Sequence, residues 1–169
     1  MCEQPLYLRP IEDGDIALLE KWLNKPYILH WYEDPAAWIN EIEQRNGSFA
    51  FINHFIVMEG SRSIGFCQYY DCYKAGEDWY SVSNPNQTYS IDYLIGEEAY
   101  LRKGYGKRVI NLLMEHIHAN TQAKEFIVKP DEDNPASCKA LTSSGFQYDK
   151  AAAYYRWGFE KDYIQKLKV

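Results

Sequence analysis

The sequence predicts an α/β fold in which helices flank one mixed, mainly antiparallel β-sheet. Pairs of strand patterns in both halves of the chain have the form of hairpins and require antiparallel pairing. In the second half, strand and helix patterns also alternate, which permits a parallel crossover. The chain has 169 residues and contains no repeat or linker-like tract, so we expect one domain over residues 1–169.

A short strand around residues 6–9 is followed by two predicted helices. In the first helix, apolar residues recur at helical spacing, and the pattern stops near Asn24 and Pro26. The second helix begins at Asp34, whose carboxylate can cap free backbone N–H groups, with Pro35 in its first position. The predicted inner faces are Ile16, Leu19, Trp22 and Leu23 in the first helix, and Trp38, Ile39 and Ile42 in the second.

A β-hairpin and a long loop come next. The strand patterns at 49–58 and 63–73 are joined by a short glycine-containing turn, which predicts an antiparallel pair. The following stretch, 74–87, is polar but contains Trp79 and Tyr80. We therefore expect a loop that carries exposed rings, which makes it a candidate wall of a substrate pocket.

The remaining elements alternate between strand and helix before a final hairpin. A strand is predicted at 88–95, an amphipathic helix at 104–118 and a short buried strand at 126–128. A further helix at 135–144 ends before a glycine, and the hairpin occupies 146–159. The order of the strands in the sheet does not follow from the sequence.

Composition and charge exclude several classes of protein. Eighteen Lys and Arg against 24 Asp and Glu give a net charge of −6, which repels phosphate backbones, so we expect no nucleic-acid partner. No apolar run is long enough for a signal peptide or a membrane-spanning helix, which predicts a cytoplasmic protein without a membrane partner. The cysteines lack the spacing of a metal site or a disulfide framework, and we expect no metal; they are Cys2, Cys67, Cys72 and Cys138.

The segment Arg102-Lys103-Gly104-Tyr105-Gly106-Lys107 lies between a predicted strand and the start of a helix. Its glycines allow the backbone to turn closely around a ligand, and the first N–H groups of the helix have no intrahelical acceptor. Arg102, Lys103 and Lys107 add positive charge, so the segment can cradle a pyrophosphate. An ordinary glycine turn with solvated basic residues is the alternative. The spacing fits neither a Walker A loop nor a GxGxxG fingerprint.

A second segment further along the chain, Asn134-Pro-Ala-Ser-Cys-Lys-Ala-Leu-Thr-Ser-Ser-Gly145-Phe146, completes a recognisable pattern. With these two segments the chain resembles the GNAT superfamily of acyl-CoA-dependent N-acyltransferases, over about Leu8 to Phe159. The resemblance implies acetyl-CoA as cofactor and a sheet whose central strands splay apart to admit it. The implied cofactor contacts are Leu94, Ile95, Arg102, Lys103, Gly104, Tyr105, Gly106, Lys107, Asn134 and Lys139.

Within that superfamily the chain is most similar to the aminoglycoside 6'-N-acetyltransferases. The similar stretches are Trp22-Leu-Asn24, Ile28-Leu-His-Trp31-Tyr32, Ile64-Gly-Phe-Cys-Gln68-Tyr-Tyr70, Gly76-Glu77-Asp78-Trp79-Tyr80 and Ile91-Asp92-Tyr93-Leu94-Ile95. The implied substrate contacts are Gln68, Tyr70, Glu77, Asp78, Trp79, Tyr80 and Asp92, with Trp31 and Tyr32 closing the pocket from the other side. For Glu77 and Asp78, solvated loop acids are the simpler alternative.

A chemical argument independently favours Asp92 as the catalytic residue. Strand alternation places Asp92 and Leu94 on one face and Ile91, Tyr93 and Ile95 on the other, just before the cofactor segment. A primary ammonium attacks a thioester only after it loses a proton, and a nearby carboxylate can orient the ammonium and accept that proton. A strand carboxylate paired with a surface cation is the structural alternative.

Two positions depart from the pattern of the superfamily. Many members carry a tyrosine that protonates the departing CoA thiolate, and the matching position here is Leu141. Relatives that modify aminoglycosides can have an acidic residue where this chain has Lys129, a cation that would repel a polycation. Both departures bear on the substrate and on the chemistry rather than on the fold.

These observations predict an N-acetyltransferase that transfers the acetyl group directly, in a ternary complex, to a primary amine. Backbone N–H groups near Leu94 and Ile95 are expected to polarise the thioester carbonyl. The expected partner is a small cationic amine, in the first place an aminoglycoside-like molecule. Acetylation of a peptide amino terminus or a siderophore precursor is an alternative, as is a non-catalytic acyl-CoA-binding module. The oligomeric state does not follow from the sequence.

Overall fold

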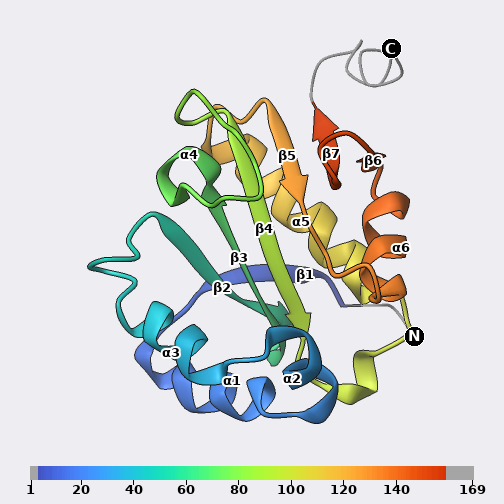
Figure 1. Ribbon diagram of the computed structural model, residues 1–169. Helices are drawn as coiled ribbons and strands as arrows, with labels where there is room; N and C mark the ends of the chain where they lie inside the picture. The colour runs from blue at the N-terminus through green and yellow to red at the C-terminus, as the bar shows by residue number, and fades with distance from the viewer. Residues whose placement is uncertain (1–3, 159–169) are drawn as a thin grey trace.

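The computed structural model describes residues 4–158, which form a seven-stranded sheet of order β1-β2-β3-β4-β5-β7-β6 (Figure 1). All neighbouring strands are antiparallel except the parallel pair β4 and β5. The strands are β1 Leu6–Pro10, β2 Ile52–Glu59, β3 Arg62–Asp71, β4 Thr88–Ile95, β5 Glu125–Val128, β6 Gln147–Asp149 and β7 Tyr154–Gly158. The predicted mixed, mainly antiparallel sheet is therefore confirmed.

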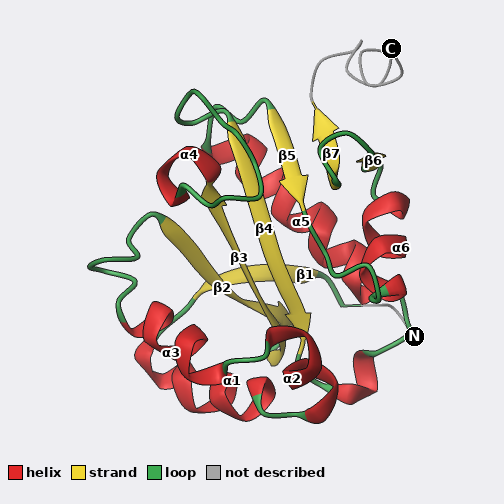
Figure 2. Cartoon of the chain, viewed as in Figure 1, coloured by secondary structure: helices red, strands yellow, loops and turns green. Residues whose placement is uncertain are grey.

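Helices cover both faces of this sheet (Figure 2). The α-helices are α1 Ile16–Leu23, α2 Pro26–Tyr32, α3 Pro35–Glu43, α4 Cys72–Ala75, α5 Tyr105–Asn120 and α6 Pro135–Ser143, with short 3₁₀ turns at Asp13–Asp15 and Glu98–Tyr100. Helices α1 to α3 pack with Phe66 and Leu94 in one core, whereas α5 and α6 pack with Cys67 and Ile91 in another. The separation follows strand alternation, because successive residues point to opposite faces.

The two central strands diverge after a short paired segment. Residues of β4 and β5 pair only at Thr88 with Glu125 and at Tyr89 with Phe126, and β4 then continues to Ile95 away from β5. Figure 1 shows the two ribbons separating towards the end of β4. The splayed central strand pair that the resemblance implied is thus present, and backbone groups of β4 face the gap.

The first half of the chain differs from the prediction in several places. Pro26 does not follow a single helix but opens a second one, α2, because proline suits the first position of a helix. The expected hairpin strands are shorter, since β2 begins at Ile52 and β3 ends at Asp71. Asp71 accepts a hydrogen bond from the N–H of Tyr73 and caps the short helix α4, which ends β3 earlier than expected.

The loop after β3 also differs from its prediction. The predicted helix cap at Asp34 and the predicted final hairpin are both present. The rings of Trp79 and Tyr80 are half-buried rather than exposed, because they pack beside a small third core. Asp34 caps α3 through a 3.1 Å hydrogen bond from the N–H of Ala37, as expected. The final hairpin is present as β6 and β7, although Phe159, its predicted end, lies outside the described residues.

Candidate active site

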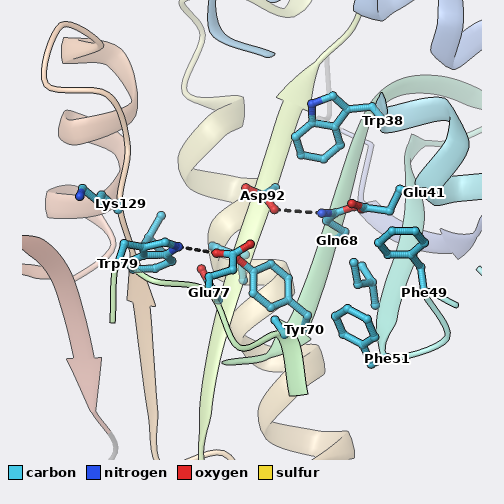
Figure 3. Close-up of a pocket in the computed structure, with 15 residues that line it drawn as sticks. Trp38, Glu41, Phe49, Phe51, Gln68, Tyr70, Glu77, Trp79, Asp92 and Lys129 are labelled. Atoms are coloured by element: carbon cyan, nitrogen blue, oxygen red, sulfur yellow. Dashed lines mark hydrogen bonds between the residues drawn. The ribbon is translucent and has the colours of Figure 1, made fainter. Parts of the chain in front are cut away.

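A cavity of about 490 Å³ lies over the region where β4 separates from β5 (Figure 3). Its walls come from α3, the turn before β2, β3, the loop after α4, β4 and the end of β5. The polar and charged lining residues are Glu41, Gln68, Glu77, Ser90, Asp92 and Lys129, and the aromatic ones are Trp38, Phe49, Phe51, Tyr70 and Trp79. The cavity is therefore both aromatic and, on balance, acidic.

Asp92 lies in the middle of this cavity, on the face of β4 that the sequence predicted. Its Oδ2 accepts a 2.9 Å hydrogen bond from Nε2 of Gln68, its direct neighbour on β3. Burial raises the pKa of Asp92 to about 6, and the negative charges of Glu41 and Glu77 raise it as well, whereas the Gln68 hydrogen bond lowers it. A carboxyl group with this pKa is suited to accept a proton near neutral pH.

The loop after β3 contributes an acid held between aromatic rings. Oε2 of Glu77 accepts hydrogen bonds from Nε1 of Trp79 and, at 3.4 Å, from the hydroxyl of Tyr70. The hydroxyl of Tyr80 accepts from the N–H of Glu77 at 3.1 Å and donates to a backbone carbonyl of α4. Tyr80 thus shapes the loop from outside the cavity, while Glu77 and Trp79 line it.

Five of the nine residues predicted to bind substrate line the cavity, and the structure places the other four elsewhere: Trp31, Tyr32, Asp78 and Tyr80. The hydroxyl of Tyr32 donates to the backbone carbonyl of Tyr93 and so ties α2 to β4 beside the cavity. Trp31 packs edge-on against a neighbouring histidine ring, and Asp78 is exposed. In this structure these residues support the pocket or lie away from it.

The wall formed by α3 was not anticipated from the sequence. Trp38 and Glu41 lie three residues apart, a spacing that places them on one helix face towards the cavity. Phe49 and Phe51 come from the turn before β2, and Ser90 from β4. The spacing of Trp38 and Glu41 was a readable signal, but only the fold shows that this face covers β3 and β4.

The predicted pyrophosphate segment forms an open turn at the start of α5. Gly104 has a φ of 82° and caps the helix without a side chain, so the first N–H groups of α5 are not blocked by a capping residue. A Cβ added at Gly106 would lie 3.6 Å from the ring of Tyr93 and 3.7 Å from Cβ of Ala140, which is ordinary contact. The two glycines are therefore not required for packing inside the protein, and they leave the backbone accessible to a ligand.

The remaining residues of the predicted cofactor site divide into exposed cations and structural groups. Arg102, Lys103, Lys107 and Lys139 are exposed near the starts of α5 and α6. The hydroxyl of Tyr105 donates a 2.5 Å hydrogen bond to Oε2 of Glu59 at the end of β2, which anchors the turn to the sheet. The side chain of Asn134 accepts from the N–H of Ser137 at 3.1 Å and caps α6.

Comparison with known proteins adds to this geometry. Residues 12–154 match the acetyltransferase (GNAT) domain family, which covers most of the chain. The chain belongs to the GNAT acetyltransferase family. Members of this family use acetyl-CoA, so the protein is an acetyl-CoA-dependent N-acetyltransferase. The start of α5 and the gap between β4 and β5 fit that cofactor, because they combine free helix N–H groups, positive charge and open glycines.

Individual relatives of this GNAT acetyltransferase are distant. The aminoglycoside N(6')-acetyltransferases type 1 of Klebsiella pneumoniae and Serratia marcescens are each 22% identical over 146 residues, which covers 83% of this chain and 73% of the relative. The structure of aminoglycoside acetyltransferase AAC(6')-Ib with coenzyme A and kanamycin has a TM-score of 0.79 at 20% identity, covering 98% of this chain and 100% of that one. Spermidine N-acetyltransferase from Vibrio cholerae, with CoA and spermine, has a TM-score of 0.66 at 18% identity, with coverages of 85% and 81%.

The backbone of β4 offers the GNAT acetyltransferase a donor for the thioester carbonyl. The N–H of Gly96 donates to the carbonyl of Ile64 on β3, so, by the alternation of antiparallel ladders, Leu94 also directs its N–H to β3. Tyr93 and Ile95 then point the other way, and their carbonyls accept from hydroxyls of α2. The alternation leaves the N–H of Ile95, rather than that of Leu94, directed into the gap beside β5.

Leu141, which replaces the usual tyrosine acid, is fully buried in the core beneath α5 and α6. The structure brings a different hydroxyl to this side of the sheet. The hydroxyl of Tyr93 lies 3.2 Å from Oγ of Ser137 on α6 and close to Gly106 on α5. A thiol with an ordinary pKa of about 8.5 can also leave as the anion near neutral pH, so transfer does not depend on an acid at Leu141.

Residues 4–158 contain no helix that is long and apolar enough to cross a lipid bilayer. Within the same part of the chain, no group of three or more His, Cys, Asp or Glu side chains has the arrangement of a metal site.

Proposed function

We propose that this enzyme acetylates a primary amine of a small polycationic substrate of the aminoglycoside type. The observation that carries the proposal is a half-buried carboxylate with a raised pKa, Asp92, in an acidic and aromatic cavity beside the gap between β4 and β5. Aromatic faces and carboxylates suit a molecule that carries rings and ammonium groups. Distant relatives named as aminoglycoside acetyltransferases, and a neighbour solved with spermine, support the same substrate class.

The proposed reaction is a direct transfer within a ternary complex. Asp92 holds the substrate ammonium and accepts one of its protons, and the freed lone pair attacks the thioester carbonyl carbon. The N–H of Ile95 stabilises the negative charge that develops on the carbonyl oxygen. The carbon–sulfur bond then breaks, the electron pair leaves with the CoA sulfur, and the nitrogen releases its second proton, which balances the proton that the sulfur takes up. The products are the N-acetylated amine and free CoA, and no covalent enzyme intermediate forms.

Release of the CoA thiol tests this proposal when the enzyme is offered acetyl-CoA and a panel of amines. We expect turnover with polyamines and aminoglycosides, and a loss of about 10² to 10⁴ in rate for Asp92→Asn with acetyl-CoA affinity unchanged. Glu115→Gln, which changes an exposed acid on α5, serves as the matched control. Near-normal turnover by Asp92→Asn would show that Asp92 has only a structural role.

A second candidate substrate is a peptide amino terminus, and the observation that favours it is Lys129. This exposed cation lines the cavity and can pair with a carboxylate of a peptide or an amino-acid-derived amine. The same amine panel separates the two candidates, because a peptide that is acetylated better than every polycation would replace the leading proposal.

A further inference from the structure

Three polar side chains form a row across β2, β3 and β4, and two of them, Gln68 and Asp92, line the cavity. His54 on β2 is the direct neighbour of Gln68 on β3, and Gln68 is the direct neighbour of Asp92 on β4. Residues directly opposite each other in a sheet point to the same face, so all three lie beneath α3. Glu41 approaches the row from α3, with its Oε1 3.5 Å from Nε2 of His54.

Gln68 in this row and Glu41 beside it each have a buried oxygen without a hydrogen bond in residues 4–158. Gln68 is only 2% exposed, and while its Nε2 donates to Asp92, its Oε1 has no hydrogen-bond partner. An ionised Asp92 accepts hydrogen bonds only, which fixes the orientation of the Gln68 amide and directs Oε1 away from Asp92. Oε1 of Glu41 is likewise buried without a hydrogen bond, as are both ring nitrogens of His54, whose Nε2 lies 3.5 Å from this oxygen.

The distribution of charge shows what kind of donor suits these atoms. Figure 3 shows Glu41 and Lys129 at opposite ends of the cavity, with Asp92 between them. The third acid, Glu77, already accepts from Trp79 and Tyr70. A carboxylate next to an unsatisfied amide oxygen, far from the cavity's lysine, favours a cationic donor over a neutral one.

We propose that Glu41 and Oε1 of Gln68 form a second ammonium subsite, so that the enzyme selects substrates with another ammonium group near the one that reacts. The reacting amine lies at Asp92, and the second ammonium lies on the α3 side, away from Lys129. His54 is a positioning residue, since its buried ring limits where the Glu41 carboxylate can go. The proposal rests on the proposed function and refines its substrate class to diamines and higher polyamines.

The test compares substrates that differ only in the second group. A graded series of α,ω-diamines, from diaminopropane to diaminohexane, is paired with amino alcohols of the same lengths at saturating acetyl-CoA. We expect the best diamine to exceed its amino alcohol in kcat/KM by at least about tenfold, because a charged hydrogen bond is lost in the alcohol. Glu41→Gln should remove this preference, so that kcat/KM for the best diamine no longer exceeds kcat/KM for the amino alcohol of the same length.

Two further variants control for folding and for the position of the charge. Glu43→Gln changes an exposed acid on the same helix, outside the cavity, and should leave the preference intact. Glu41→Asp retains the charge but shortens the side chain by one methylene, so the best diamine should become one carbon longer. This shift keeps the proposal testable even where Glu41→Gln folds poorly, and an unchanged best length in Glu41→Asp would overturn it.

A binding measurement separates failure of the subsite from failure of the proposed reaction. Calorimetry of the CoA-loaded enzyme with each diamine and amino alcohol reports the preference without any acetyl transfer. A diamine preference in binding that Glu41→Gln removes supports the subsite, even where no amine of the panel releases CoA and the proposed function therefore fails. Equal binding of diamines and amino alcohols, or a preference that survives Glu41→Gln, overturns the subsite, whether or not amines are acetylated.

Discussion

Asp92 must be ionised to accept a proton, yet burial and the neighbouring acids favour its neutral form. The groups that face it are Gln68 and Tyr70 from β3, Glu41 from α3, Glu77 from the loop and Tyr32 from α2. Because its pKa is raised to about 6, kcat/KM should fall about tenfold per pH unit below that value. Measuring kcat/KM from about pH 5 to 8, with substrate amines that stay protonated over this range, tests this decrease. A flat profile over this range would exclude Asp92 as the base.

The same pKa predicts that the function of Asp92 costs stability. Above about pH 6 the folded protein holds a buried charge, whereas below about pH 4 the carboxyl is protonated in the folded and unfolded states alike. Asp92→Asn keeps an acceptor for Nε2 of Gln68 but removes the charge. The variant should therefore be more stable at pH 7, by up to about 3 kcal/mol, with the gain disappearing between about pH 6 and 4. Urea unfolding of the variant and the wild type at pH 7 and at pH 4 measures this difference in stability. A variant that is less stable than the wild type at pH 7 contradicts the prediction.

At the scale of elements, the sequence predicted those that local chemistry determines. Capping by Asp34, the hairpin β2–β3, the glycine turn before α5 and the face of β4 that carries Asp92 all follow from spacing and residue type. Pro26 was misinterpreted because proline both follows one helix and begins the next. The strand order, with β7 between β5 and β6, depends on contacts distant in sequence.

The candidate site shows the same division between local and distant information. Short stretches that resemble a known family pointed to Glu77, Trp79 and Asp92, which line the cavity, but also to Asp78 and Tyr80, which do not. Glu41 could not, because its role depends on how α3 packs over His54 and Gln68, which no local pattern encodes. Which residues face the cavity therefore depends on the packing of elements that are distant in sequence, and short stretches alone did not determine it.

The turn at the start of α5 yields a prediction that separates cofactor binding from folding. Gly106→Ala places a methyl group at ordinary contact distance from Tyr93 and Ala140, and alanine favours a helix over glycine by about 1 kcal/mol. Stability should therefore be unchanged or slightly higher. Affinity for acetyl-CoA should nevertheless fall, by about tenfold or more, if the pyrophosphate approaches the backbone there. Calorimetry with acetyl-CoA, beside a melting curve, measures both, and unchanged affinity would place the cofactor elsewhere.

Across the whole molecule, the sheet separates the proposed amine site from the proposed cofactor site. The cavity proposed to bind the amine lies beneath α3, whereas the start of α5 and its basic residues lie with the other core. Asp92 and Tyr93 are adjacent on β4 but point to opposite faces, and the gap beside β5 is where the faces meet. Both substrates can therefore be bound together, which predicts sequential kinetics. Double-reciprocal plots of the initial rate against one substrate, at several concentrations of the other, should give intersecting lines. Parallel lines would indicate a covalent enzyme intermediate instead.

The charge of the whole molecule determines how strongly a polycation is attracted, and Lys129 opposes that attraction. A net charge of −6 and the acids of the cavity attract ammonium groups, while Lys129 repels them from one end. Because exposed charges are screened over about 8 to 10 Å near physiological salt, KM for a polyamine should rise with ionic strength, and KM for a monoamine much less. Lys129→Glu should lower KM for aminoglycosides by about two- to fivefold, as expected for a partly exposed charge.

Lys124→Glu is the matched control for this last prediction, because it makes the same charge change at an exposed position that does not line the cavity. Each comparison is made at saturating acetyl-CoA, since salt should also weaken the proposed contacts between the cofactor phosphates and the cations before α5. A general change in molecular charge would affect KM equally in both variants, whereas a local effect appears in Lys129→Glu alone. If Lys129→Glu instead leaves KM for aminoglycosides unchanged and abolishes acetylation of a peptide amino terminus, Lys129 binds a substrate carboxylate and the peptide is the substrate.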